Sequence, residues 1–138
     1  KIKLIFFSTG YVYQGKKGNY KEDDAILPWN KYGWSKLGAE AAVHLYDNSL
    51  IIRACMTEEP FIHKYAYSNV KSNFIYHKDF AKIFLKIINK KGIFNVGGKS
   101  QSIYNFAKKY NHNVLKKESK GEFPKKMDMN LNKLKKII

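Results

Sequence analysis

The most constraining feature of this chain is a tyrosine and a lysine placed four residues apart at the expected start of a helix. Tyr32 and Lys36 lie in the run 28–36, and an apolar segment, 4–7, precedes them and leads into Thr9. Four residues make about one helical turn, so the two side chains share a face. A lysine charge beside a phenol stabilises the phenolate and makes the phenol a usable proton donor or acceptor. The pair indicates carbonyl reduction or alcohol oxidation.

The spacing Tyr-x-x-x-Lys is not specific by itself, because it also begins at Tyr13, Tyr67 and Tyr104. The pair at Tyr32 differs in its setting. It lies in a Pro-x-Asn-x-Tyr-Gly-x-Ser-Lys run at a helix start, downstream of a strand that ends in Ser-Thr. This setting favours a functional pair over the alternative of an ordinary buried ring and a surface cation.

Apolar runs and segments with helical spacing alternate along the chain. Runs without polar alternation at 4–7, 49–53 and 92–96 are typical of parallel strands buried on both faces. Helices are expected over 30–46, over 79–88, and from Ser100 or Ser102 through Tyr110. Residues 55–73 are irregular, and a weak final helix is expected near the end of the chain. Strands alternating with helices predict an α/β layer fold with a parallel sheet.

The chain is strongly basic, with a formal net charge of +15 at pH 7. Clustered cations bind nucleic acids by releasing counterions. However, bidentate recognition of phosphates and bases favours arginine, and Arg53 is the only arginine among 26 basic residues. The lysines are spread between apolar segments rather than gathered in one tract. We therefore expect a solvated basic surface, with nucleic acid an unlikely partner and a polyanion-binding module the least favoured function.

Other sequence features bound the location and the chemistry. Cys55 is the only cysteine, which excludes an internal disulfide and fits a reducing compartment, so a cytoplasmic location is expected. No apolar run approaches the roughly 20 residues that a membrane span needs. The four histidines lack metal-ligand spacing, so no metal site is expected.

Three linked motifs resemble the extended short-chain dehydrogenase/reductase family, also called NAD-dependent epimerase/dehydratase proteins, and in particular the dTDP-4-dehydrorhamnose reductases. Ser-Thr-Gly-Tyr-Val-Tyr-Gln-Gly at 8–15 resembles the family's Ser-Thr-Asp-Tyr-Val-Phe-x-Gly. Residues 19–24 resemble its Tyr-x-Glu-x-Asp segment, and residues 32–36 with Glu40 resemble its catalytic helix. Residues 50–53, 74–81 and 94–98 resemble later segments.

The resemblance implies a fold that is the C-terminal half of such a protein, a partial Rossmann-like parallel sheet. Residues 1–54 would be the back half of the Rossmann-like domain with the catalytic helix. Residues 55–138 would be the C-terminal substrate-side region, with a weakly defined tail at 111–138. The N-terminal dinucleotide-binding strands and their Gly-x-x-Gly-x-x-Gly turn are expected to be missing, which would leave the edge of a normally central strand uncovered. The chain is then a truncated portion of an enzyme, a half that pairs with a complementing N-terminal half, or a relative that forms a homodimer across that edge.

The resemblance also implies roles for named residues. Thr9 would hydrogen-bond the reacting sugar oxygen, Tyr32 would be the acid or base, and Lys36 would support Tyr32 and hold the nicotinamide ribose of NADP or NAD. Cys55 would face the nicotinamide, the alternative being an inert buried thiol.

The implied function is a nucleotide-sugar oxidoreductase that reduces a 4-keto sugar. An NAD-dependent nucleotide-sugar epimerase and a non-catalytic half-domain that binds a partner chain remain alternatives. Dehydration is disfavoured, because the family's dehydratases carry an acidic pair where this chain has Gly10 and Tyr11. The family's reductases usually carry Asp at the position of Gly10.

Overall fold

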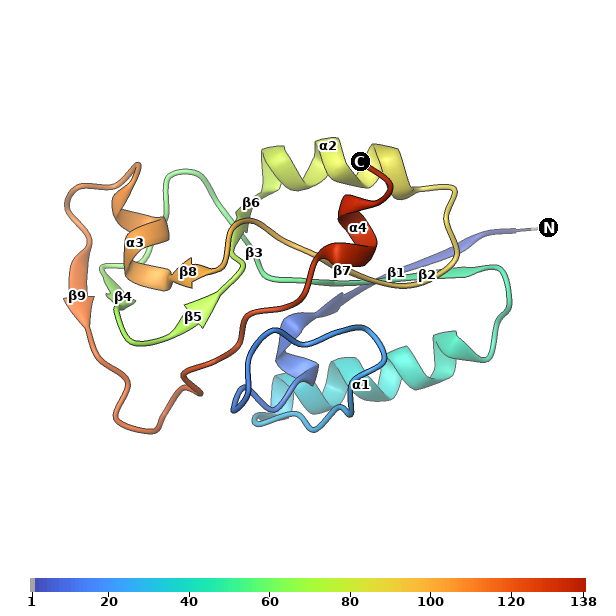
Figure 1. The fold of residues 1–138 in the computed structure, drawn as a ribbon, viewed down its shortest axis with the longest axis horizontal. Helices are drawn as coiled ribbons and strands as arrows, with labels where there is room; N and C mark the ends of the chain where they lie inside the picture. The colour runs from blue at the N-terminus through green and yellow to red at the C-terminus, as the bar shows by residue number, and fades with distance from the viewer. Residues whose placement is uncertain (1) are drawn as a thin grey trace.

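A three-stranded parallel sheet forms the centre of the computed structural model, which describes residues 2–138 (Figure 1). Its strand order is β1-β2-β7, with β1 at Leu4–Thr9, β2 at Ser49–Ala54 and β7 at Gly92–Val96. β2 is buried along its whole length because it is the middle strand. The predicted α/β fold with parallel strands is confirmed.

Helices cover both faces of this sheet. α1 (Lys31–His44) lies on one face, and α2 (His77–Ile87) and α4 (Asn132–Lys135) lie on the other (Figure 1). The side chain of Asn30 accepts a hydrogen bond from the Gly33 amide at 2.7 Å, which caps the first turn of α1. Apolar side chains of α2, α4 and the sheet form one core cluster. The helices expected over 30–46 and 79–88 are both present.

The segments beyond β2 form shorter elements beside the main sheet. The small ladders pair β3 (Met56–Thr57) with β6 (Ile75–Tyr76), β4 (Tyr65–Tyr67) with β9 (Leu115–Lys117), and, antiparallel, β5 (Lys71–Ser72) with β8 (Gln101–Ser102). A single 3-10 turn, η1 (Gly10–Val12), follows β1, and α3 (Ile103–Lys108) is capped by Ser102. The irregular stretch 55–73 therefore contributes strands that the sequence pattern did not show.

The C-terminal tail is packed rather than loosely attached. It returns from β9 across the molecule to α4 (Figure 1). Met127 and Leu134 are each 1% exposed, and the Met127 amide donates to the Lys71 carbonyl oxygen at 2.9 Å. The tail had been expected to be weakly defined, because its apolar residues are sparse. Those few residues fill core positions that elements distant in the sequence leave open.

β1 lies at the edge of the sheet, and β7 joins the sheet from beyond residue 54. Leu4 and Phe7 are each 40% exposed, so the burial on both faces expected of a central strand is not found in β1. The reason is that no other strand of residues 2–138 pairs with its outer edge. Among these same residues, no helix is both long and apolar enough to cross a bilayer.

Candidate active site

The three predicted catalytic side chains meet at one small cavity. This cavity, of about 250 Å³, is lined by Thr9, Tyr32 and Lys36, and also by Cys55. Thr9 ends β1, Tyr32 and Lys36 come from the first two turns of α1, and Cys55 directly follows β2. The carboxyl ends of adjacent parallel strands are where α/β folds bind ligands. The fold therefore gathers these four residues from three separate segments.

Thr9 is held in place by the turn that follows it. Its side chain is almost buried, with 4% of the residue exposed, and its hydroxyl oxygen accepts a hydrogen bond from the Tyr11 amide at 3.2 Å. This contact makes Thr9 the N-cap of η1. The hydroxyl hydrogen is not used in this contact, so Thr9 can still donate to a ligand in the cavity.

Tyr32 is half exposed at the mouth of the cavity, and its ring meets the edge of the Tyr11 ring with centroids 6.1 Å apart. Burial raises the pKa of Tyr11, and the neighbouring Cys55 and Tyr32 raise it further. Tyr11 therefore stays a neutral phenol beside Tyr32. A side chain at Gly33 would place its Cβ 2.5 Å from the Tyr11 carbonyl oxygen, so the glycine after Tyr32 allows the helix start to approach this turn closely.

Lys36 lies on the same face of α1 as Tyr32, as the spacing predicts. Its Nζ atom is 6.0 Å from the centroid of the Tyr32 ring and 5.1 Å from the centroid of the Phe6 ring. The ammonium donates a hydrogen bond to the backbone carbonyl oxygen of Phe7 at 2.9 Å. The sequence pattern did not predict this main-chain acceptor.

Cys55 fills space beside the glycine that replaces the family's usual aspartate. A Cβ atom at Gly10 would lie 2.9 Å from Cys55 Sγ and 3.3 Å from Met129 Sδ. Cys55 is 6% exposed, and burial raises the pKa of its thiol. The two sulfur atoms thus occupy the room that a longer side chain at Gly10 would need.

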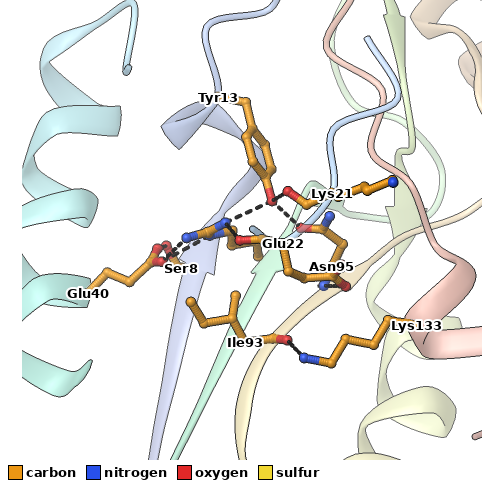
Figure 2. Close-up of polar contacts among 9 residues, drawn as sticks. Ser8, Tyr13, Lys21, Glu22, Glu40, Ile93, Asn95 and Lys133 are labelled. Carbon is orange, nitrogen blue, oxygen red and sulfur yellow. Dashed lines mark hydrogen bonds and ion pairs between the residues drawn. The ribbon is translucent and has the colours of Figure 1, made fainter. Parts of the chain in front are cut away.

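A buried polar network anchors α1 to the sheet (Figure 2). Ser8 Oγ donates to Glu40 Oε2 at 2.7 Å, and Arg53 Nε donates to Glu40 Oε1 at 2.9 Å. Arg53 Nη1 also donates to the Tyr13 hydroxyl at 2.8 Å, and that hydroxyl donates to Asn95 Oδ1 at 2.7 Å. The network links β1, α1, β2 and β7. It holds the helix that carries Tyr32 and Lys36 against the strand that carries Thr9.

Sequence reasoning missed most of this network. Glu40 was noted only as part of the catalytic-helix motif, and Glu22, whose carboxylate accepts from the Asn95 amide at 2.9 Å, received no role. One available signal was Arg53 itself, the only arginine in a lysine-rich chain, because arginine is the residue best suited to a buried bidentate ion pair.

A second, larger cavity of about 600 Å³ lies next to the first, and Tyr11, Met56 and Phe74 line both. Its other walls are rich in aromatic and basic side chains, namely Phe61, His63, Lys64, Tyr65, Tyr67, Lys117 and Phe123. These residues come from the stretch 55–73 and from the tail. Sequence reasoning did not find this cavity, because neither segment shows a regular pattern. In the part of the chain that the structure describes, no group of three His, Cys, Asp or Glu side chains is placed to hold a metal ion.

The family model for the RmlD substrate binding domain matches residues 1–92 of the chain. The chain belongs to this family. Solved structures agree with the assignment. A hypothetical dTDP-4-dehydrorhamnose reductase from Sulfolobus tokodaii superposes with a TM-score of 0.81 at 28% identity, over 99% of this chain and 58% of that one. The predicted membership of the extended short-chain dehydrogenase/reductase group, and its Rossmann-like fold, are thus confirmed.

Two further RmlD relatives define the breadth of the similarity. The dTDP-4-dehydrorhamnose reductase of Bacillus anthracis in complex with NADP has a TM-score of 0.78 at 25% identity, covering 96% of this chain and 57% of that chain. UDP-glucuronic acid 4-epimerase from Bacillus cereus in complex with NAD has a TM-score of 0.71 at 22% identity, covering 98% and 54%, and shares the fold. This chain thus spans less than two thirds of the solved structures that it matches. No curated protein matches it.

Proposed function

We propose that this chain is the catalytic and substrate-side part of a nicotinamide-dependent nucleotide-sugar oxidoreductase that reduces a 4-keto sugar, as dTDP-4-dehydrorhamnose reductases do. The observation that carries the proposal is the meeting of Thr9, Tyr32 and Lys36 in one cavity at the end of β1. A hydroxyl, a phenol and an ammonium in one cavity can bind a carbonyl oxygen and deliver a proton to it.

In this proposal each residue has one task. The Thr9 hydroxyl donates to the carbonyl oxygen of the sugar and orients it. Tyr32 transfers its phenolic proton to that oxygen while the carbonyl carbon receives a hydride. NADP or NAD, when bound, supplies this hydride. Lys36 binds the ribose hydroxyls beside the nicotinamide and stabilises the Tyr32 phenolate that forms. Cys55 gives the nicotinamide a small apolar surface.

The residues present are compatible with such a cofactor. Tyr32 is half exposed at the cavity, and Lys36 and Cys55 line it as well. A phenol and an ammonium directed to one opening suit the two adjacent hydroxyls of a ribose. The RmlD relative from Bacillus anthracis was solved with NADP and the Bacillus cereus epimerase with NAD, which supports one of these two dinucleotides.

The larger cavity suits the nucleotide part of the substrate. Its aromatic rings can stack on a base, and Lys64 and Lys117 bring positive charge to its wall. Tyr11 lies between the two cavities, so a ligand that fills both would place its sugar near Tyr32 and its nucleotide beyond Tyr11.

We further propose that the dinucleotide-binding strands come from a complementing N-terminal half, which pairs with the chain in the cytoplasm. The uncovered edge of β1 supports this, as does the greater length of the RmlD relatives. A homodimer across this edge is the alternative partner arrangement.

A non-catalytic relative that binds a partner chain is the second candidate function. It is favoured by Gly10, where the family's reductases usually carry Asp and where Cys55 and Met129 now fill the space. An NAD-dependent nucleotide-sugar epimerase is the third, supported by the fold shared with the Bacillus cereus epimerase.

The test uses a fusion of the N-terminal part of the Sulfolobus tokodaii reductase ahead of residue 1. NADPH absorbance is followed in the presence of a dTDP-4-keto sugar. We expect turnover, and we expect Tyr32→Phe to lower kcat by about 100- to 10,000-fold. Tyr104→Phe is the matched control, because Tyr104 and Lys108 have the same spacing but lie outside both cavities. Unchanged turnover in Tyr32→Phe would refute its role. A folded fusion that binds NADPH without turnover would favour the non-catalytic candidate.

A further inference from the structure

The backbone of β1 presents alternate residues to its free edge. The Leu4 amide donates to the Asn48 carbonyl oxygen at 3.1 Å, and Leu4 pairs with Ser49 of β2. In a parallel ladder, every second residue directs its N–H and C=O to the same side. The register runs without a break to Thr9. Phe7 is an odd number of residues from Leu4, so its carbonyl points away from β2, to the unpaired edge.

Lys36 occupies this edge acceptor. Its ammonium donates to the Phe7 carbonyl oxygen at 2.9 Å and lies over the Phe6 ring. A hydrogen bond from a charged donor is stronger than one between neutral groups. The side chain proposed to hold the cofactor ribose is therefore engaged by a main-chain group that a neighbouring strand would normally bind.

The most suitable occupant of this edge is a strand of another polypeptide segment rather than a second copy of the chain. The sheet is entirely parallel, and Leu4 and Phe7 are each 40% exposed on its outer strand. Two copies paired through β1 would bring two molecules of charge +15 together, with Lys3 and Lys36 of each near the contact. The RmlD relative from Sulfolobus tokodaii is longer, since this chain covers 58% of it. This favours a parallel strand from the dinucleotide-binding part.

We propose that Lys36 and this added strand compete for the Phe7 carbonyl, so that strand pairing along β1 releases Lys36 into the catalytic cavity. The inference rests on the proposed function for the identity of the partner. A paired strand lies about 4.8 Å from β1 and places an N–H on each outward carbonyl. The displaced ammonium remains on α1, next to Tyr32. Assembly of the sheet and readiness of the active site are thus coupled through one hydrogen bond.

The first test examines the chain alone by NMR, with ¹⁵N in its lysines and ¹³C in the carbonyls of its phenylalanines. We expect a slowly exchanging ammonium signal for Lys36 that shows scalar coupling across the hydrogen bond to the Phe7 carbonyl and disappears in Lys36→Met. Lys82 is the control, because its ammonium donates to the Asp79 carboxylate and so couples to no phenylalanine. A Lys36 signal without coupling to Phe7 overturns the proposal.

The second test repeats the measurement on the fusion with the Sulfolobus tokodaii N-terminal part. Pairing is detected independently, as protection of the outward amides of Ile5 and Thr9 from hydrogen exchange. When these amides are protected, we expect the coupling to Phe7 to vanish and trace acetylation of Lys36 to rise about tenfold, the effect of losing one charged hydrogen bond. Coupling that persists in the protected state overturns the proposal.

A synthetic peptide that copies β2, Ser49–Ala54, flanked by glutamates, provides an independent strand. If neither the fusion nor this peptide at millimolar concentration protects the two amides, β1 is not a strand-docking edge and the proposal fails. The readouts do not depend on turnover. Release of Lys36 in a fusion that transfers no hydride would leave this inference standing and would refute only the proposed reaction.

Discussion

The carboxylate of Glu40 and the guanidinium of Arg53 form an ion pair in the interior, with side chains 4% and 3% exposed. Two guanidinium nitrogens, Nε and Nη2, donate to the same carboxylate oxygen, and Ser8 donates to the other. Burial alone would lower the pKa of Arg53, but the hydrogen bonds and charge of Glu40 raise it above its ordinary value. The pair therefore stays charged and fixes α1 on the sheet.

Removing one partner of this pair should be strongly destabilising. Glu40→Leu leaves a buried guanidinium without its counter-charge, so we expect the free energy of unfolding to fall by about 3–5 kcal/mol, measured by urea denaturation. The double variant Glu40→Leu with Arg53→Met should recover most of this loss, because no buried charge remains. Glu122→Gln, in the exposed pair with Lys117, is the control and should change stability by less than about 1 kcal/mol. Equal effects of the buried and exposed substitutions would contradict the role given to the pair.

Two glycines near α1 should respond to substitution in opposite directions. Gly10→Asp brings a side chain against Cys55 and Met129 and should cost about 1–3 kcal/mol of unfolding free energy. Gly38→Ala, in the middle of α1 with no atom within 4 Å of the new Cβ, should stabilise by about 0.5–1 kcal/mol. Thermal denaturation of both variants checks this. A stable Gly10→Asp variant would show that the two sulfur atoms can move aside.

Thr9 should matter more to catalysis than to stability. Thr9→Val removes the cap of η1 and should lower the free energy of unfolding by about 1 kcal/mol. The same change should lower kcat of the fusion by about 100-fold or more, because a donor to the reacting oxygen is lost. Thr9→Ser keeps the hydroxyl and should retain most of both properties. If Thr9→Val turns over as fast as Thr9→Ser, the hydroxyl does not act on the substrate.

The buried thiol of Cys55 should make the protein less stable in alkali. Its pKa is raised by burial in the folded chain, whereas in the unfolded chain it titrates near pH 8.5. Above that pH the unfolded state binds fewer protons than the folded state, so the free energy of unfolding falls as the pH rises. This contribution is fully absent below the unfolded pKa and cannot exceed about 1.4 kcal/mol per pH unit.

The measurement is urea denaturation at a series of pH values on both sides of the ordinary thiol pKa. Cys55→Ala should show a shallower decline than the parent chain, even if its stability at neutral pH is lower because of the lost packing. Parallel slopes for the two proteins would mean that the thiol is not desolvated in the folded state.

Several elements could be predicted because their signals are local. β2 reads as an apolar run since a middle strand is buried on both faces, and α1 begins where Asn30 can cap a helix. The spacing of Tyr32 and Lys36 placed them on one face for the same reason. Predictions failed where the outcome depended on partners distant in the chain. Phe7 is exposed because of what lies beside β1, and the tail is buried because of the gaps that it fills.

The sequence by itself determined the family, the parallel α/β layers and the identity of the three catalytic candidates, because periodicity and short motifs encode local geometry and burial. Only the tertiary structure decided that Cys55 and Met129 fill the space at Gly10, that Glu40 meets Arg53, and that aromatic residues of the tail complete the larger cavity. It alone placed the Lys36 ammonium on the Phe7 carbonyl, 29 residues away in the chain. Contacts of this kind are set by long-range packing and by the choice of side-chain rotamer, which no local pattern records.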